Sequence, residues 1–521
     1  MIRFPLVILA FLSALPALAQ APNRAALQML FVIDGLRPDS INATDTPNLF
    51  RLRSEGVNFE NSHAVFPTVT RVNSSSISTG MQPGRHGILG NQIYIPSVDA
   101  DKAFPNDNYQ PLLRMDAVSP GNIVLAPSIA EMAAESGHRY AAVSSGSTGS
   151  ALLMAPRAPR GSGIVINGDF QVDGQPGWPA AIAAEVARRF GRPAKKGGAE
   201  DHYDAQVDWA FRVLREYVLP ELKPDVVYNW VTEPDHIQHA FGAGAPQSVN
   251  SIRNADRNIG LVLETLAKLG IADRTNLMVV SDHGFGQTVY GVNVRQEFAG
   301  GGFKPEDAVI ASSGQAVAVH VRDRNPALIR SYVEYLQKQA WIGVVFTAGG
   351  SSGREHEGAV PGTFALEYAH LGGGERAPDI LFTFPWSSAR NRHGVQGTDY
   401  VMLSGGETGP MDTATAQHGS MSPWTVRNTM LAWGPGFKRG ARVRTPSSNV
   451  DVTPTMLHLL GNPKAASLEG RVLSEALAGG PDEEQVAAEV RTLRVGTGNY
   501  RAAMQVTETA GRRYLDKSWR E

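Results

Sequence analysis

Five short apolar runs rich in β-branched residues recur along the chain, and they constrain its fold more than any other feature. They are LQMLFVIDG (27–35), HRYAAVSS (138–145), DVVYNWVTEPD (225–235), NLMVVSDHG (276–284) and NTMLAWGPG (428–436). Runs of this kind are typical of strands in a sheet that is covered on both faces. Amphipathic stretches at 178–191, 204–222 and 249–270 alternate with them. The alternation predicts an α/β fold with three layers, α/β/α, around a mostly parallel central sheet.

The remainder of the chain predicts how this domain is divided. With 521 residues the chain exceeds the usual size of a single core, so we expect one large domain with insertions over residues 24–480. Two regions rich in Gly, Pro and Ser, 92–125 and about 290–400, break the alternation and predict insertions, the second forming a cap subdomain. The charged segment PDEEQVAAEVRTLR predicts a helical C-terminal tail over residues 481–521.

The first twenty residues predict export. Arg3 precedes an apolar run at 4–12, and the small residues Ala17 and Ala19 mark a cleavage site. This layout indicates a signal peptide over residues 1–19 and a periplasmic or secreted protein. A membrane anchor is the alternative, but Pro16 interrupts the run, and no stretch reaches the roughly 18 apolar residues of a spanning helix.

Composition narrows the chemistry and the partners. The chain has no cysteine, which excludes disulfides, thiol nucleophiles and thiolate metal sites. Its formal net charge of −2 gives no bulk attraction to a nucleic acid polymer or to an anionic membrane.

Acidic and histidine side chains follow three of the predicted strands, at the edge where α/β sheets place their ligands. Asp34 ends the first strand. Asp235 and His239 follow the third at a spacing of four, which places both on one face of a helical turn. Asp282 and His283 follow the fourth strand. Each residue alone fits an ordinary helix cap or exposed helix face, but their conjunction indicates a metal site.

A further histidine completes this set. We assign His418, in the loop HGSMS just before the last predicted strand, although His356, His370 and His393 also lie in loop-like segments. Carboxylates combined with imidazoles suit Zn²⁺ better than Ca²⁺. The set exceeds the roughly four ligands of one tetrahedral zinc, so it predicts two metal ions, an arrangement used in phosphoryl transfer.

The segment FPTVTRVNSSSISTG (66–80) predicts a hydroxyl-rich helix over residues 71–79 that Gly80 ends. Thr70 would lie at the N-terminus of this helix, where free N–H groups and the helix dipole favour an anion. A threonine hydroxyl beside a metal ion can act as a nucleophile. The alternative is that Thr70 only caps the helix.

Together these motifs resemble a known family. VIDGLRPD, FPTVTRVNSSSISTGMQPGRHGILGN, EPDHIQHAFG, VVSDHGFG and HGSMS, with NTMLAWGPGF and VDVTPTMLHLLG after it, are similar to motifs of the alkaline phosphatase superfamily. More specifically, they resemble its nucleotide pyrophosphatase/phosphodiesterase branch, in order from residue 28 to residue 461. The resemblance implies the alkaline-phosphatase-like fold, with a catalytic domain over residues 24–480.

The resemblance also implies a site and a mechanism. Two Zn²⁺ ions are expected, with Thr70 as nucleophile and Asn73 as the residue that hydrogen-bonds a phosphoryl oxygen. Thr70 would attack in line, and the phospho-threonine would then be hydrolysed. One zinc would be held by Asp235, His239 and His418, and the other by Asp34, Asp282, His283 and Thr70.

Two departures from the family pattern concern the substrate, a small-molecule phosphate ester. Arg71 stands where nucleotide-hydrolysing members carry Phe. Region 143–154 lacks the Lys-x-Arg pair of phosphomonoesterase members, although Arg157 and Arg160 lie just downstream. We therefore predict a phosphodiester or pyrophosphate-type substrate, with Arg71 as a binding residue. The alternatives are a phosphomonoesterase or phosphonate hydrolase on the same site, or an inactive exported binding homologue.

Overall fold

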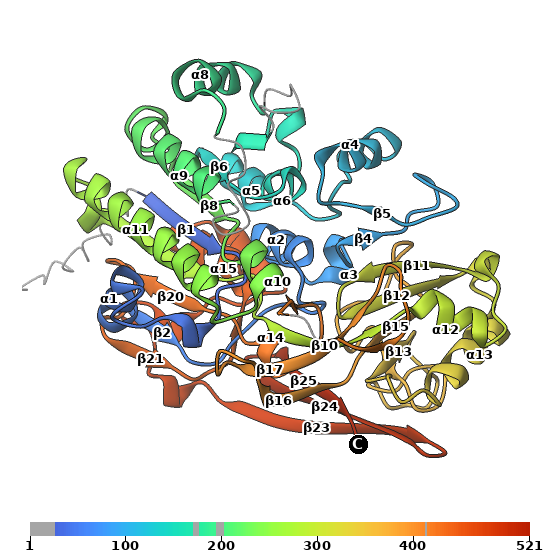
Figure 1. Cartoon of the computed structure of the whole chain (residues 1–521). Coiled ribbons are helices and arrows are strands. Elements are labelled where there is room, and N and C mark those ends of the chain that lie inside the picture. The colour runs from blue at the N-terminus through green and yellow to red at the C-terminus, as the bar shows by residue number, and fades with distance from the viewer. Residues whose placement is uncertain (1–26, 170–176, 194–202, 412–413) are drawn as a thin grey trace, which may run out of the picture.

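The computed structural model describes residues 27–169, 177–193, 203–411 and 414–521, so the predicted signal peptide (1–19) lies outside the described residues. An eight-stranded sheet forms the centre (Figure 1). Its strands are β1 (Leu27–Ile33), β2 (Val57–Phe59), β6 (Tyr140–Ser144), β7 (Ile164–Asn167), β8 (Val226–Val231), β9 (Thr275–Val280), β20 (Met430–Trp433) and β21 (Ala441–Val443). Their spatial order is β21-β2-β20-β9-β1-β8-β6-β7.

The central sheet is mostly parallel, as predicted. β1 pairs in parallel with β8 on one side and β9 on the other, and β20 runs antiparallel to both of its neighbours. Each of the five predicted apolar runs contains one of these strands, namely β1, β6, β8, β9 or β20. Every residue of β1 is buried, because helices cover both faces of the sheet.

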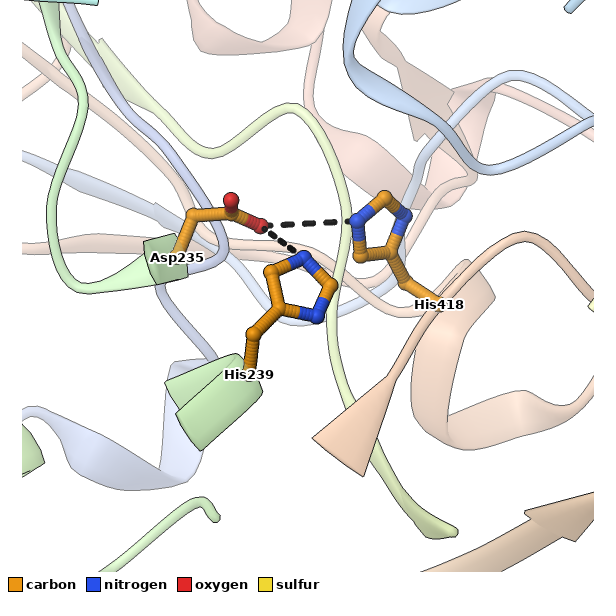
Figure 2. A group of neighbouring side chains, drawn as sticks. All are labelled: Asp235, His239 and His418. Atoms are coloured by element: carbon orange, nitrogen blue, oxygen red, sulfur yellow. Dashed lines mark ion pairs between the residues drawn. The ribbon is translucent and has the colours of Figure 1, made fainter. Parts of the chain in front are cut away.

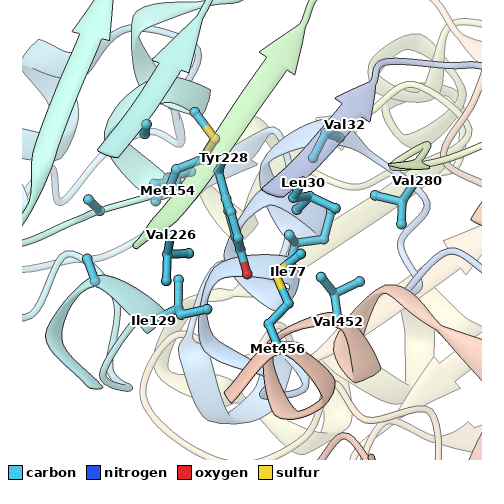
Figure 3. Packing of buried hydrophobic residues seen from close by; sticks show 14 of the residues in the cluster. Leu30, Val32, Ile77, Ile129, Met154, Val226, Tyr228, Val280, Val452 and Met456 are labelled. Carbon is cyan, nitrogen blue, oxygen red and sulfur yellow. The ribbon is translucent and has the colours of Figure 1, made fainter. Parts of the chain in front are cut away.

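Two helical layers give the fold its three-layer architecture. One face of the sheet packs against α1 (Pro47–Glu55), α8 (Ala180–Phe190), α9 (Asp204–Val213) with its π-helical continuation (Leu214–Leu222), and α11 (Pro246–Lys268). The other face packs against α2 (Thr70–Thr79), α5 (Ile129–Glu135), α6 (Thr148–Leu153) and α15 (Val452–Leu459). Figure 3 shows this second interface, where Ile77 of α2 and Met456 of α15 lie beside Tyr228. None of the helices in the described ranges has the length and apolar character that crossing a bilayer requires.

The first predicted insertion, 92–125, contains the hairpin β4 (Gln92–Ile93) and β5 (Phe104–Pro105), followed by α4 (Tyr109–Val118). The region around 290–400 contains a five-stranded sheet with its own apolar core. The elements of this cap subdomain are α12 (Val294–Gly300), β11 (Ala308–Ser313), β12 (Ala316–Val321), α13 (Pro326–Leu336), β13 (Val345–Thr347), β14 (Phe364–Ala365) and β15 (Ile380–Thr383).

A second five-stranded sheet connects this subdomain to the central domain. It consists of β10 (Gly286–Val292), β16 (Trp386–Arg390), β17 (Gln396–Met402), β18 (Gly409–Pro410) and β19 (Ala416–Gln417). Short elements near the site are β3 (Ser62–His63), α3 (Pro83–His86), α10 (Asp235–Phe241), α14 (Pro423–Val426) and β22 (Ser447–Ser448).

The C-terminal segment corrects the prediction of a helical tail over residues 481–521. It forms an antiparallel meander of β23 (Ala488–Thr497), β24 (Tyr500–Thr509) and β25 (Arg512–Arg520) along the lower edge of Figure 1. The Ala and Glu content of its first part favours a helix, but from Leu493 onwards buried and exposed residues alternate. Gly498 and Gly511 have positive φ in the two connecting turns, which suits hairpins.

Candidate active site

The sheet brings the predicted acidic residues together at the carboxyl ends of its three central strands. Asp34 follows β1, and Asp282 and His283 follow β9. Asp235 begins α10, four residues after β8 ends. Because β1 is hydrogen-bonded between β8 and β9, these ends meet at one edge of the sheet.

A first group consists of Asp235, His239 and His418 (Figure 2). Oδ1 of Asp235 lies 3.4 Å from Nε2 of His239, one helical turn further along α10. The same oxygen lies 3.4 Å from Nε2 of His418, which a loop after β19 contributes. The predicted i, i+4 spacing thus brings a carboxylate oxygen of Asp235 and Nε2 of His239 close together. Nε2 of His418 approaches the same oxygen from another segment of the chain.

A second group lies beside the first around His283. Its Nε2 is 3.2 Å from Oδ2 of Asp282, 3.6 Å from Oδ1 of Asp34 and 3.9 Å from Oδ1 of Asp235. Oγ1 of Thr70 is 3.4 Å from the same nitrogen. The rings of His283 and His418 stack with centroids 3.5 Å apart, so the two groups are adjacent.

Each carboxylate of this cluster has one oxygen that accepts no hydrogen bond from the described residues. Oδ1 of Asp34, Oδ1 of Asp235 and Oδ2 of Asp282 are buried and have no hydrogen-bond partner among the described residues. Trp230 Nε1 donates to the other oxygen of Asp34 at 3.0 Å, and Gly35 N donates to that of Asp282 at 3.0 Å. One oxygen of each of these two carboxylates is thus held by the protein while the second points into the cluster, which fits metal coordination.

The histidines are oriented in the same manner. Nδ1 of His239 donates to a backbone carbonyl of residue 416 at 2.9 Å, and Nδ1 of His418 donates to that of Thr68 at 2.9 Å. Nδ1 of His283 contacts its neighbouring carbonyl at 3.1 Å. A donating Nδ1 leaves Nε2 with a free lone pair, so all three rings present a ligand atom to the cluster.

Burial and charge crowding shift the titration of these groups. Burial, together with the neighbouring carboxylates Asp282 and Asp235, raises the pKa of Asp34 well above its usual value. Burial and Asp235 raise the pKa of Asp282 to about 7. For Asp235 burial also acts upward, but His239 and His418 hold its pKa well below the usual value. The protein alone thus leaves the negative charge of Asp34 and Asp282 under-compensated, as expected of a site for cations.

Helix α2 places Thr70 at this cluster. The helix begins at Thr70 and ends at Thr79, and Gly80 adopts a left-handed φ of 67°, as the sequence predicts. No side chain caps its start, and the Thr70 hydroxyl faces His283 instead of a backbone N–H, which argues against a capping role. The serines of α2 are buried, and Ser78 donates to a carbonyl of α6 at 2.9 Å. They therefore fix the helix against its neighbour.

The hydrogen bonds of Asn73 differ from those that its predicted role requires. Its Oδ1 accepts hydrogen bonds from Val65 N at 2.8 Å and Asn449 Nδ2 at 3.0 Å. Its Nδ2 donates to the carbonyls of Val65 at 3.0 Å and Val69 at 3.1 Å. Because both amide hydrogens are used and the side chain is fully buried, Asn73 holds the loop before α2 and has no donor left for a phosphoryl oxygen.

Asn91, which the sequence reasoning did not single out, lies beside the start of α2. Its Oδ1 accepts from Arg71 N, the second residue of α2, at 3.2 Å, and Ser313 Oγ accepts from its backbone N–H at 3.0 Å. This places its amide next to Thr70, with Nδ2 free of hydrogen bonds to the described residues. The segment GILGN that carries it was part of the family motif, but only the tertiary fold brings it to α2.

Arg71 follows Thr70 in α2, and its side chain is half-buried. Its Nη2 donates to Ser147 Oγ at 3.2 Å, at the start of α6, within the region 143–154 that lacks a basic residue. Its Nε is buried without a partner among the described residues. Arg71 therefore places a positive charge close to the start of α2.

Arg157 and Arg160 do not supply that charge. Arg157 pairs with Glu131 at 2.7 Å, and Arg160 pairs with Asp116 at 2.8 Å. Region 143–154 contains no basic residue, and the two arginines downstream do not supply the missing positive charge.

The other candidate histidines lie in different surroundings. Nε2 of His370 contacts the carbonyl of Arg513 at 3.1 Å, and the ring of His356 packs beside Tyr368. His393 is exposed in a turn. Of the four loop histidines considered, His418 is the one that the fold brings to the cluster.

Comparisons with known proteins show which family this chain resembles. Residues 29–387 match the type I phosphodiesterase/nucleotide pyrophosphatase family. Venom phosphodiesterase 2 of Crotalus adamanteus is 26% identical over 259 residues, which is 49% of this chain and 26% of that protein. Ectonucleotide pyrophosphatase/phosphodiesterase family member 3 of Bos taurus is 23% identical over 263 residues, 50% of this chain and 25% of that protein. The aligned region spans about a quarter of the length of these curated relatives.

Solved structures show the same fold. Murine ectonucleotide pyrophosphatase/phosphodiesterase 5 superposes with a TM-score of 0.59 at 17% identity, covering 87% of this chain and 100% of that chain. An inactive variant of the same protein in complex with AMP superposes with a TM-score of 0.56 at 18% identity, covering 84% of this chain and 95% of that chain. The predicted alkaline-phosphatase-like fold class is therefore confirmed. With the family match covering most of its length, the chain belongs to the type I phosphodiesterase/nucleotide pyrophosphatase family.

Proposed function

We propose that this chain is an exported two-zinc hydrolase that cleaves phosphodiester or pyrophosphate-type bonds through a phospho-threonine intermediate. One observation carries the proposal: unpartnered carboxylate oxygens and imidazole Nε2 atoms converge in front of the Thr70 hydroxyl. Membership of the family supports the same reaction class.

The donor set fits two zinc ions. One zinc would be held by Asp235, His239 and His418, and the other by Asp34, Asp282, His283 and Thr70. When bound, the zinc ions would supply positive charge to phosphoryl oxygens and lower the pKa of a hydroxyl group beside them. Carboxylate and imidazole ligands in this number suit Zn²⁺ better than Ca²⁺ or Mg²⁺.

The residues around Thr70 then have distinct roles. Oγ1 of Thr70 loses its proton to solvent and forms a bond to phosphorus, while the bond to the leaving-group oxygen breaks and that oxygen takes up a proton from solvent. Asn91 Nδ2, next to the start of α2, donates to a nonbridging phosphoryl oxygen, which replaces the role first assigned to Asn73. The N-terminus of α2 stabilises the negative charge that develops there. Water then cleaves the phospho-threonine and regenerates the hydroxyl.

Arg71 favours a substrate with a second anionic group. Its guanidinium reaches Ser147 through Nη2, and its Nη1 makes no hydrogen bond to the described residues, so the side chain has a free donor toward a ligand. A guanidinium binds phosphate oxygens well, whereas the Phe of nucleotide-hydrolysing relatives stacks on a base. We therefore propose that Arg71 contacts a second phosphate of a pyrophosphate-type substrate and that base recognition contributes less.

Export is proposed from the leader pattern of residues 1–19 and is consistent with the relatives, which include a venom phosphodiesterase and an ectonucleotide pyrophosphatase/phosphodiesterase. Expression in a bacterial host with a periplasm, followed by N-terminal sequencing of the product, tests it. A mature chain that begins at Gln20 in the periplasmic fraction is expected. A chain that retains Met1 in the cytoplasmic fraction would contradict it.

Substrate class is tested by comparing bis-p-nitrophenyl phosphate with p-nitrophenyl phosphate on the zinc-loaded enzyme. We expect a higher kcat/KM for the diester. A strong preference for the monoester would favour the phosphomonoesterase alternative. Absence of both zinc binding and hydrolysis would favour the inactive binding homologue.

The nucleophile is tested with Thr70→Ala, and Thr79→Ala at the opposite end of α2 is the matched control. Thr70→Ala should abolish turnover while zinc stays bound, because three other protein ligands remain in its group. Thr79→Ala should retain activity. Trapping of labelled phosphate on the control but not on Thr70→Ala would identify the phospho-threonine. Persisting activity in Thr70→Ala would leave the residue with a structural role only.

A further inference from the structure

The loop of residues 418–422, here called the His418 loop, depends on distant residues for its position. His418 Nδ1 donates to the carbonyl of Thr68 at 2.9 Å. Gly419 N donates to the Thr68 hydroxyl oxygen at 3.1 Å, and this hydroxyl in turn donates to the carbonyl of Ser420 at 2.8 Å. The first half of the loop is thus fixed to the segment that leads into α2.

The second half of the His418 loop is attached to the C-terminal sheet. Ser518 N, on β25, donates to the carbonyl of Met421 at 3.0 Å. The carbonyl of Ser518 accepts from Trp386 Nε1 at 2.6 Å. The Met421 side chain is buried in the same apolar cluster as Met504 of β24 and Leu515 of β25. β25 therefore holds the loop by a backbone hydrogen bond and by apolar packing.

The hydrogen bond at Ser518 points away from the meander. Ser518 pairs with Met504 across β24 and β25, and its N–H donates to Met421 on the outer side of β25. Since a backbone N–H has one hydrogen to donate, this bond is not part of the β24–β25 ladder. Its loss would leave the pairing of the two strands intact.

A second contact connects β25 with the other side of the site. Oδ1 of Asp516 lies 2.9 Å from Nε2 of His63, and Oδ2 accepts from the Thr507 hydroxyl of β24 at 2.8 Å. His63 ends β3, and the chain continues from it through Thr68 to Thr70. The C-terminal sheet therefore contacts the His418 loop and also the segment that leads from His63 into α2.

We propose that the sheet β23–β25 positions the metal ligand His418, with Ser518 as the positioning residue through its N–H. This inference rests on the two-zinc function proposed above. It assigns a role to a segment that lies beyond the residues matched by the family, 29–387. Loosening of the Ser518–Met421 contact should affect the group Asp235, His239 and His418 and leave the group around His283 unchanged.

The test compares Ser518→Pro with Ser518→Ala in the full-length chain. Proline removes the N–H, whereas alanine keeps it and deletes only a hydroxyl that has no partner among the described residues. Zn²⁺ affinity is measured for both by competition with a chromophoric chelator. We expect Ser518→Pro to bind one of two zinc ions about 10-fold more weakly than Ser518→Ala, the range typical of residues that orient metal ligands.

Two further readouts separate positioning from general stability. Co²⁺ in place of Zn²⁺ should give a changed visible spectrum in Ser518→Pro, because the coordination geometry at one site changes. Hydrogen exchange of the metal-free proteins should be faster for residues 418–422 in Ser518→Pro and unchanged in the strands β1 and β9. The exchange measurement does not require bound metal, so it tests the attachment even if the two-zinc proposal fails.

Equal zinc affinities, equal spectra and equal exchange in the two Ser518 variants would overturn the inference. If Ser518→Pro does not fold, Trp386→Phe decides, because it removes the donor to the Ser518 carbonyl and keeps an aromatic ring in place. A weaker second zinc and faster exchange in residues 418–422 are expected, and wild-type values would overturn the inference. A wild-type chain that binds no zinc would instead contradict the proposed function.

Discussion

Asp34 and Asp282, the proposed strand-end ligands, reach the cluster in a different way from His418. Asp34 and Asp282 lie directly after β1 and β9, which hydrogen-bond to each other along their whole length. His418 lies in a loop between β19, a short strand of a different sheet, and the short helix α14. Contacts from Thr68 and the C-terminal strand fix this loop. The strand ends are thus placed by the central sheet itself, whereas the loop needs support from residues far away in the sequence.

Some proposed ligands are therefore held in position by the central sheet, whereas His418 is held in position by contacts outside that sheet. A backbone held on both sides in a buried sheet has little freedom, so a side chain at its end keeps its position when neighbours change. A loop has more freedom and lies at the lower end of local stability. We therefore expect substitutions that loosen support to matter more for the His418 side than for the strand-end side.

Loss of a strand-end ligand should have the largest effect. Asp282→Asn removes a fully buried carboxylate that the rigid strand end cannot replace with another group. We expect loss of one zinc per chain and a decrease in kcat/KM of roughly 10³-fold, measured by metal analysis and diester hydrolysis. Asp256→Asn, a buried aspartate on α11, is the control that should retain both metals. Full zinc content in Asp282→Asn would show that the strand-end group does not hold a metal.

Loss of the loop ligand should have a smaller effect. His418→Ala leaves Asp235 and His239 in place, and the loop can admit water at the vacated position. We expect zinc at this group to bind about 10²-fold more weakly, with activity partly restored at high Zn²⁺ concentration. His370→Ala in the cap subdomain is the matched control. If His418→Ala lost activity as completely as Asp282→Asn and without rescue by Zn²⁺, the loop would be as rigid as the strand ends.

The sequence predicted the strand-end side well for the same physical reason. Apolar runs that end in Asp or Asp-His can be found in a single sequence, and parallel strands bring their ends together. The positions of Asp34, Asp282 and His283 therefore followed from local pattern and fold class. The helix over residues 71–79 was also predictable, because Gly80 marks its end.

Other parts were not predictable because tertiary contacts decide them. Asn73 looks available on a polar helix, but the loop before α2 uses its whole amide. Asn91 reaches α2 only after the chain has folded back past α3. The C-terminal meander has a helix-like composition at its start, and packing on the cap subdomain's apolar cluster selects strands instead.

A substitution at Asp399, which hydrogen-bonds the His418 loop, tests how much that loop depends on its neighbours. This fully buried carboxylate on β17 accepts from Ser420 Oγ at 3.1 Å and Ser422 Oγ at 3.2 Å. Asp399→Asn keeps one acceptor oxygen for the two hydroxyls, so the loop loses one anchor. We expect about 10-fold weaker zinc binding in chelator competition. Asp379→Asn, a buried aspartate of the cap subdomain, should leave zinc affinity unchanged; equal losses in both variants would indicate a general effect on stability.

Removal of a hydrogen bond that supports a proposed strand-end ligand should have the smallest effect. Trp230→Phe removes the Nε1–H that donates to Oδ2 of Asp34 at 3.0 Å and keeps an aromatic ring in the core. Because the end of β1 is fixed by β8 and β9, Asp34 should stay in place. Zinc binding should weaken only about threefold, a change in free energy near the lower limit for one net hydrogen bond. Trp209→Phe, which loses a hydrogen bond to the carbonyl of Gly191, is the control for an altered tryptophan. A loss in Trp230→Phe larger than that in Asp399→Asn would reverse the comparison, since the strand-end ligand would then depend on its neighbour more than the loop ligand does.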